Sequence, residues 1–173
     1  MDADLPSDAG VLGEEGEALD AILGGRLRII QKKSGYRFSI DALLLAHFVI
    51  LKEGEECIDL GTGSGVVALI LACRRCRGRI LGIDIQEELA AMARRSVELN
   101  GLAGCVEISQ GDIRNPESCI ASTSFDVAVF NPPYRRLRSG RVNPDSGKAV
   151  ARHEIEGTVG DFLAAAFYAL KPG

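Results

Sequence analysis

The chain contains no tryptophan, only two histidines and 5% aromatic residues, and no apolar run approaches the ~20 residues of a membrane-spanning helix. Its N-terminus is acidic where a secretory leader would be basic. The cysteines match neither a small secreted disulfide framework nor paired metal-ligand spacing. There are five: Cys57, Cys73, Cys76, Cys105 and Cys119. These absences predict a cytoplasmic protein with reduced thiols, no membrane association and no metal.

The rest of the composition is that of one soluble domain, with 46% hydrophobic and 25% charged residues in 173. The charge is uneven, because residues 1–25 hold seven acidic side chains and no basic one. The overall net charge of −4 therefore leaves +3 on the remainder. Residues 1–18 also lack periodic apolar positions. We expect residues 1–18 to be a disordered acidic leader and residues 19–173 to form the folded domain.

Strand and helix patterns alternate from residue 56 onward. Short apolar strands are expected at residues 57–60, 79–84, 105–109 and 126–130, with a weaker one at 27–31. Helices are expected at 64–73, 87–99 and 158–170, and an apolar helix capped by Ser39 is expected through residue 50. Parallel strands need crossover connections, so this alternation predicts a doubly wound parallel α/β sheet with its ligand site at the carboxyl ends of the strands.

The end of the sequence carries a further expectation. A helix that closes on Lys171-Pro172-Gly173 normally leads into another strand. We therefore expect a sheet without its C-terminal strands, in which residues 127–130 form an exposed edge. Such an edge would allow pairing with a second copy in a homodimer.

A glycine-rich turn, residues 59–65 (DLGTGSG), follows the first strand of this series. Its glycines permit positive φ and close approach of a ligand to the backbone. Their spacing differs from the dinucleotide fingerprint, so a nicotinamide cofactor fits less well than S-adenosylmethionine, which carries no phosphate. The expected contacts within the turn are Asp59, Gly61, Thr62, Gly63 and Gly65.

Acidic residues end the next two strands. Asp84 would accept hydrogen bonds from both ribose hydroxyls, and Asp59 would accept one from the methionine ammonium group through water. Asp112 would accept from the adenine amine, with Ile85 and Ile113 packed on the ring. Each acid taken singly is also consistent with a solvated strand end or a helix cap.

The fourth strand runs directly into Asn131, Pro132, Pro133 and Tyr134 (NPPY). An exocyclic amine is a weak nucleophile because its lone pair is delocalised. The Asn131 side-chain oxygen and the Pro132 carbonyl would hold both amine hydrogens and aim the lone pair, while the prolines stiffen the turn and Tyr134 stacks on the planar group. Taken alone, the motif could be a simple turn. With the glycine turn it predicts methyl transfer to such an amine.

These motifs resemble the amino-methylating branch of class I methyltransferases, with their Rossmann-like fold. Residues 31–45 (QKKSGYRFSIDALLL) narrow the resemblance to the tRNA1(Val) adenine-37 N6-methyltransferase family, as does Ala151-Arg152-His153-Glu154. The resemblance covers about residues 22–173. It implies that Tyr36, Phe38 and Asp41 line the cofactor and that the substrate is the 6-amino group of an adenine in tRNA.

Other substrates share the two motifs. A glutamine methyltransferase acting on a release factor is one alternative, although residues 1–50 are too short for the helical N-terminal domain of that family. An rRNA guanine amino-methyltransferase and an inactive fragment that binds cofactor or RNA also remain open.

A basic segment follows the transfer motif. Over residues 135–152 six basic side chains stand against one acid, Asp145. They are Arg135, Arg136, Arg138, Arg141, Lys148 and Arg152. This charge predicts contacts with the phosphates of RNA, with a merely solvated loop as the alternative. His47 lies within an apolar run, so we expect it to be buried or half-buried.

Overall fold

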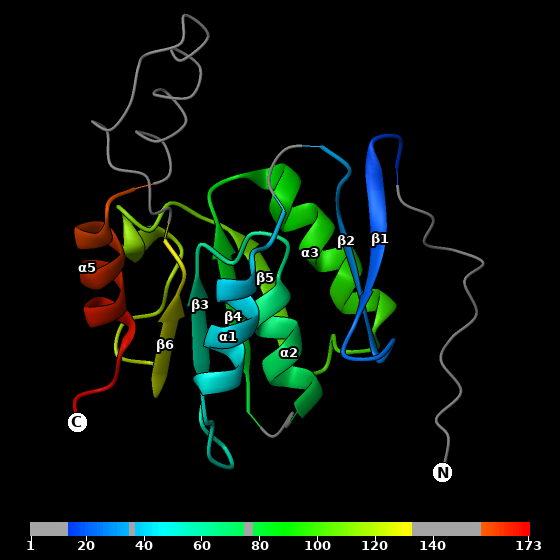
Figure 1. The fold of residues 1–173 in the computed structure, drawn as a ribbon. Coiled ribbons are helices and arrows are strands. Elements are labelled where there is room, and N and C mark those ends of the chain that lie inside the picture. Colours follow the sequence, from blue (N-terminus) through cyan, green and yellow to red (C-terminus); the bar gives the residue numbers. More distant parts are fainter. Residues whose placement is uncertain (1–13, 35–36, 75–77, 133–156) are drawn as a thin grey trace, which may run out of the picture.

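The structure is a computed structural model that describes residues 14–34, 37–74, 78–132 and 157–173. Its described strands are β1 Glu17–Ile22, β2 Leu27–Lys32, β3 Cys57–Leu60, β4 Ile80–Asp84, β5 Val106–Gln110 and β6 Val127–Phe130. Its described helices are α1 Ile40–Phe48, α2 Val66–Arg74, α3 Glu87–Leu99, the 3-10 helix η1 Pro116–Ser118 and α5 Val159–Ala169. Figure 1 shows a central sheet with helices on both faces and a hairpin beside it.

The central sheet has the strand order β5-β4-β3-β6, and each neighbouring pair is parallel. Within the central sheet, the chain begins in the middle with β3, adds β4 and β5 on one side, and then returns to place β6 on the other side of β3. This confirms the predicted parallel α/β fold. The direction in which strands are added reverses at β3, and parallel α/β folds bind ligands at such a switch point.

Two apolar layers cover the sheet because successive strand residues point to opposite faces. Cys57 packs into a core formed with α1, α2 and α3, whereas Ile58 and Leu60 pack into a second core with α5. All seven residues from Val66 to Ala72 are buried, so α2 is enclosed on every side. In α3 one face is buried, with Ala90, Met92, Ala93 and Val97 among its residues.

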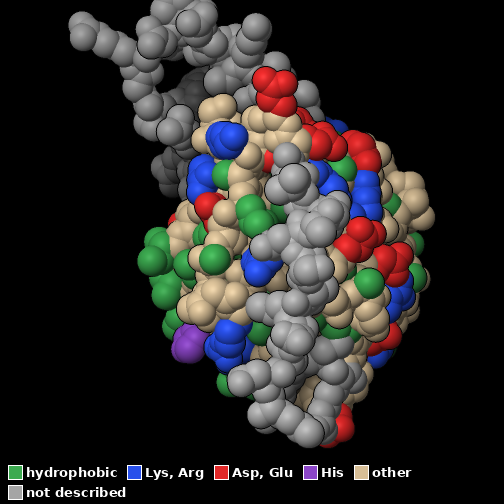
Figure 2. All heavy atoms as spheres, turned by 90° about the vertical axis from the view of Figure 1, so that its right-hand side faces the viewer, with side chains coloured by type: hydrophobic (Ala, Val, Ile, Leu, Met, Phe, Trp, Pro, Cys, Tyr) green, Lys and Arg blue, Asp and Glu red, His purple; other side chains and the backbone are tan. Residues whose placement is uncertain are grey.

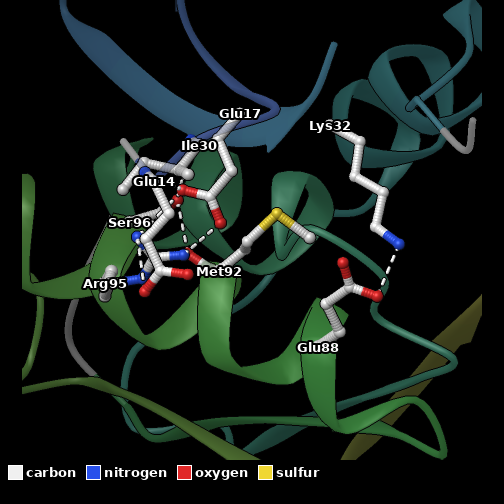
Figure 3. Close-up of polar contacts among 8 residues, drawn as sticks. All are labelled: Glu14, Glu17, Ile30, Lys32, Glu88, Met92, Arg95 and Ser96. Atoms are coloured by element: carbon white, nitrogen blue, oxygen red, sulfur yellow. Dashed lines mark hydrogen bonds and ion pairs between the residues drawn. The ribbon is translucent and has the colours of Figure 1, made fainter. Parts of the chain in front are cut away.

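The hairpin of β1 and β2 is bound to α3 by side chains (Figure 3). Ser96 accepts a hydrogen bond from the Ile30 N–H at 2.9 Å, and Asn100, one turn later, accepts one from the Arg28 N–H at 2.9 Å. The guanidinium of Arg95 pairs with Glu17 of β1. These contacts satisfy the edge of β2 that faces away from β1, so the hairpin is a fixed part of the domain.

β1 begins at Glu17, two residues before the expected start of the folded domain at residue 19. The disorder expected for residues 1–13 lies outside the described residues and stays a prediction. Glu17 is paired with Arg95, and Asp20 accepts hydrogen bonds from Gln31 and Arg37. Acidic residues here are partners in a folded surface, and Figure 2 shows Asp/Glu and Lys/Arg side chains interspersed on this side of the molecule.

β6 is the outermost described strand on its side of the sheet, as predicted for residues 127–130. Helices on both sides of it expose apolar residues at every fourth position: Ile40, Leu44 and Phe48 of α1, and Val159, Leu163 and Phe167 of α5. His47 is exposed, so its predicted burial is wrong. The run containing it is apolar on all sides, and the pattern could not show which face of α1 meets α2.

The thiols differ in state. Cys57, Cys73 and Cys119 are free, and burial raises the pKa of Cys57 to about 12. Cys105 is disulfide-bonded, so the expectation that every thiol is reduced is wrong for this residue. In the described part of the chain, no helix is long and apolar enough to cross a membrane.

Candidate functional site

The two motifs singled out in the sequence lie side by side at the carboxyl edge of the sheet. In the β3–β6 register Leu60 is opposite Phe130, so Gly61 and Asn131 each follow a member of the same pair. In the β3–β4 register Leu60 is opposite Ile83, and Asp84 follows on the other side of the turn. The glycine turn therefore lies between Asp84 and Asn131.

The glycine turn depends on backbone conformations that other residues avoid. Gly61, Gly63 and Gly65 have φ values of +69°, +58° and +79°. A Cβ at Gly61 would lie 3.0 Å from the Phe162 ring of α5, and one at Gly65 would lie 3.1 Å from the Ala93 Cβ of α3. The turn is therefore held close to α5 on one side and to α3 on the other, which requires glycine at both positions.

Asp59 is completely buried beneath this turn. Its Oδ2 accepts a hydrogen bond from the Thr62 hydroxyl at 2.7 Å, and the Ala68 N–H near the start of α2 also donates to the carboxylate. Burial raises the pKa of Asp59, the hydrogen bonds from Thr62 and Ala68 lower it and the charge of Asp84 raises it, and together they bring it to about 7. Asp59 thus joins the turn to the first turn of α2.

Asp84 joins the turn to β4. It is 6% exposed, and its Oδ2 accepts from the Gly63 N–H at 2.8 Å while its Oδ1 accepts from the Gln86 N–H at 2.9 Å. A carboxylate oxygen can accept hydrogen bonds from more than one donor. Ser64 adds a further polar group, since its hydroxyl is buried and has no hydrogen-bond partner among the described residues. A buried polar group without a partner is unusual and fits a ligand contact.

The end of β5 presents a contact that the sequence reasoning missed. Arg114 binds both carboxylate oxygens of Asp112, through Nε at 2.8 and 3.0 Å and through Nη2 at 2.6 Å. The guanidinium lowers the pKa of Asp112, which stays ionised. Ile113 is buried in the second core, and Ile85 is half-buried. The arginine two residues after Asp112 was the only signal in the sequence for this pair.

Asn131 is half-buried and Pro132 is buried, directly after β6. The Asn131 side chain has no hydrogen bond to another described residue. Behind the strand, the rings of Phe130 and Phe162 lie 5.5 Å apart between centroids, tilted by 35°. Phe162 therefore touches both the glycine turn and the transfer strand. Sequence reasoning missed it because α5 reaches this position only through the fold.

The segment that precedes α1 packs on the core beneath α1 and α2. Phe38 is half-buried and packs against the core that contains Val66 and Val67, the first residues of α2 after the glycine turn. Asp41 is exposed in the first turn of α1, where its carboxylate accepts from the Ser39 hydroxyl at 3.2 Å. Tyr36, the third residue predicted here, lies outside the described residues.

The remaining predicted contacts also lie outside the described residues. For the transfer motif these are Pro133 and Tyr134. For RNA binding they are Arg135, Arg136, Arg138, Arg141, Lys148 and Arg152. Their roles stay predictions.

The structure also has a hollow away from this edge. A hollow of about 340 Å³ is lined by Val49, Ile50, Leu51, Leu71 and Arg74. It lies at the C-terminal ends of α1 and α2, away from the carboxyl edge, and Arg74 there donates to the carbonyl of Ala46. Within the described ranges, no group of three or more His, Cys, Asp or Glu side chains could hold a metal ion.

Comparison with known proteins identifies the family. The model of a methyltransferase domain family matches residues 51–153, more than half of the chain. The chain belongs to this methyltransferase domain family. The match includes the glycine turn and the Asn131 motif, so it covers both halves of the edge described above.

Individual relatives confirm the resemblance predicted from residues 31–45. A tRNA1(Val) (adenine(37)-N6)-methyltransferase of Porphyromonas gingivalis is 37% identical over 58% of this chain and 39% of its own length. One of Aeromonas salmonicida is 33% identical over 76% and 54%. The Caenorhabditis elegans rRNA N(6)-adenosine-methyltransferase metl-5 is 29% identical over 63% and 51%. The chain thus spans between about two fifths and half of the length of these relatives.

Solved structures confirm the fold class. TrmN from Thermus thermophilus has a TM-score of 0.56 at 24% identity, covering 76% of this chain and 35% of that one. A SAM-dependent methyltransferase from Thiobacillus denitrificans, in complex with S-adenosyl-L-homocysteine, has a TM-score of 0.53 at 24% identity, covering 79% and 46%. Both share the Rossmann-like arrangement of the central sheet.

Proposed function

We propose that this chain carries the methyl-donor site and the transfer turn of an S-adenosylmethionine-dependent methyltransferase that acts on the 6-amino group of an adenine in tRNA. The observation that carries this proposal is the β3–β6 register, which puts Gly61 beside Asn131. A donor over the glycine turn and an amine held at Asn131 would then be neighbours. The named activities of the relatives support the reaction class and the adenine substrate.

The residues of the turn fit S-adenosylmethionine. The donor has an ammonium group and two ribose hydroxyls, which need acceptors, and a cationic sulfonium, which favours acidic surroundings. The Asp84 carboxylate, at the end of β4 beside the turn, would accept from the ribose hydroxyls, and the buried Ser64 hydroxyl offers another partner. Asp59 is enclosed beneath the turn, so it would act on the ammonium through the turn or a water. Ile85 and Asp112 would border the adenine.

The donor would supply an electrophilic methyl group, and the protein would hold the target amine in position to attack it. Asn131 Oδ1 and the Pro132 carbonyl would each accept one hydrogen of the target amine, which concentrates the nitrogen lone pair along the line of attack. The nitrogen–carbon bond forms as the carbon–sulfur bond breaks. Sulfur keeps the electron pair, and the amine afterwards releases one proton to water. No strong base is needed, which suits an edge whose acids face the donor.

The test is mass spectrometry of nucleosides from tRNA incubated with the chain and isotopically labelled S-adenosylmethionine. Labelled N6-methyladenosine is the expected product. Total rRNA is run in parallel because metl-5 is named for rRNA. Labelled 2-methylguanosine, or labelled methylglutamine in a release factor, would instead support an alternative substrate. Donor binding without any labelled product would contradict the catalytic part of the proposal.

RNA binding has its own test. If four of the basic side chains of residues 135–152 meet phosphates, the logarithm of tRNA affinity should fall with the logarithm of salt concentration at a slope of roughly −3. Filter binding across a salt series measures this slope. A slope near zero would remove the phosphate contacts from the proposal.

A further inference from the structure

The buried side chain of Gln31 connects the hairpin to the segment beside the glycine turn. Gln31 is 2% exposed at the end of β2. Its Nε2 donates to the carboxylate of Asp20 on β1, and its Oε1 accepts from the Phe38 N–H at 3.4 Å. A glutamine amide rarely occupies a buried site unless its donors and acceptor are satisfied. Here the amide has partners on both sides.

The same carboxylate reaches the segment by a second route. Arg37 donates through Nη2 to Asp20 and through Nη1 to the Lys32 carbonyl at 3.2 Å. Asp20 therefore holds Gln31 from one side and Arg37 from the other. Both contacts end on residues 37–38, which lead through Ser39 into α1.

The hairpin is a firm support for these contacts. Ser96 and Asn100 of α3 bind the backbone of Ile30 and Arg28, and Lys32 pairs with Glu88 in the first turn of α3 at 2.5 Å (Figure 3). The start of α3 follows Asp84 by only three residues. Residues 37–38 are thus tied through β2 to the element that begins beside the donor site.

We infer that Gln31 is a positioning residue for the methyl donor: with Asp20 it fixes residues 37–38, of which Phe38 packs against the core that α2 shares, so that they form a fixed wall of the donor site. This inference rests on the proposed function. If these hydrogen bonds are lost, residues 37–38 populate other conformations, and only a fraction of the molecules can bind the donor. The apparent dissociation constant of the donor then rises by the inverse of that fraction. The chemical step, which involves Asn131, is untouched.

The direct test is Gln31→Leu, which keeps most of the volume and removes both hydrogen bonds. We expect about ten-fold weaker S-adenosylmethionine binding by calorimetry, the effect of about one hydrogen bond. In the methylation assay KM for the donor should rise by a similar factor while kcat stays within about two-fold. A purely structural role would instead lower the folded fraction, which reduces kcat without raising KM.

A polarity swap provides the rescue. Gln31→Glu places two carboxylates together and should also weaken donor binding. Adding Asp20→Asn reverses the donor and the acceptor, and this double variant should recover most of the affinity. The swap keeps the inference testable even if Gln31→Leu does not fold. A Gln31→Glu variant with wild-type affinity, or a double variant no better than Gln31→Glu, would overturn it.

Ser96→Ala is the matched control, because it removes a buried hydrogen bond to the same strand without touching residues 37–38. It should lower the thermal midpoint yet leave the donor dissociation constant within about two-fold. An equal loss of affinity in Ser96→Ala and Gln31→Leu would mean that general hairpin stability is responsible, which contradicts a specific role for Gln31. Failure of the wild-type chain to bind the donor would reject the proposed function itself.

Discussion

The two sides of the carboxyl edge are built by different forces. On the donor side, hydrogen bonds connect buried groups: Asp59 to Thr62, and Asp84 to Gly63 and Gln86. On the transfer side, the Phe130 and Phe162 rings pack together, Pro132 is buried, and the Asn131 amide has no partner among the described residues. A site for a constant ligand has its polar groups pre-oriented by each other, whereas a site for an incoming substrate keeps its polar groups available.

The largest effect is expected on the transfer side. Asn131→Ala removes one of the two acceptors for the amine, and removal of one such pre-oriented group slows turnover by about 10²–10³-fold. Donor affinity should stay within about two-fold, since Asn131 contacts no residue of the glycine turn by hydrogen bond. Single-turnover kinetics and calorimetry check the two values. Asn115→Ala is the control, because Asn115 is an exposed asparagine before η1. An equal loss of donor affinity and turnover would contradict a role for Asn131 in transfer alone.

The opposite result is expected on the donor side. Asp84→Asn removes a charge that accepts from two backbone N–H groups, and hydrogen bonds to charged groups are strong, so donor affinity should fall about 30- to 100-fold. At saturating donor, turnover should change much less. Calorimetry with S-adenosylhomocysteine measures the affinity independently of catalysis. A variant that binds the donor normally but turns over slowly would contradict the assignment of Asp84 to donor binding.

A pH experiment examines the buried part of the donor side. Asp59 has a folded pKa of about 7 against its ordinary value of 3.8, so between these values the folded state holds a proton that the unfolded state releases. Its contribution to the free energy of unfolding therefore falls as the pH rises from about 4 to about 7. Asp59→Asn cannot titrate. We expect the thermal midpoint of the variant to gain on the wild type between pH 5 and pH 7; a constant difference would exclude this titration.

The smallest effect is expected far from the edge. Arg95→Met breaks the pair with Glu17 and should lower the free energy of unfolding by about 0.5–1 kcal/mol at neutral pH without changing donor affinity. Arg95 lowers the pKa of Glu17, so this stabilisation is present above the ordinary value of 4.5 and is lost as the pH falls below it. Urea titrations at pH 7 and pH 3.5 check this. Arg94→Met, which breaks the more exposed pair with Glu87, should change stability less.

The sequence predicted the central sheet well because its signals are local. Residues 57–65 show an apolar strand, a turn that only glycine allows and an apolar helix in one continuous stretch. Asp84 could be placed because a strand end fixes which edge it occupies. The two motifs were predictable as parts of one edge, whereas the pairing that sets Gly61 beside Asn131 came from the structure.

The parts that failed depend on contacts between distant segments. Glu17 was assigned to the acidic leader, and only its pairing with Arg95 and its place in β1 show that the hairpin begins there. His47 lies in a helix that is apolar on every side, so its exposure depends on where α2 packs. Phe162 and Arg114 acquire their roles from neighbours that no local pattern specifies.

Phe162 has a consequence for how the molecule can work. Its ring lies close to Gly61 and to the Phe130 ring, so one side chain of α5 supports the ends of both neighbouring strands. A larger or smaller side chain at this position would therefore disturb the donor turn and the transfer strand together.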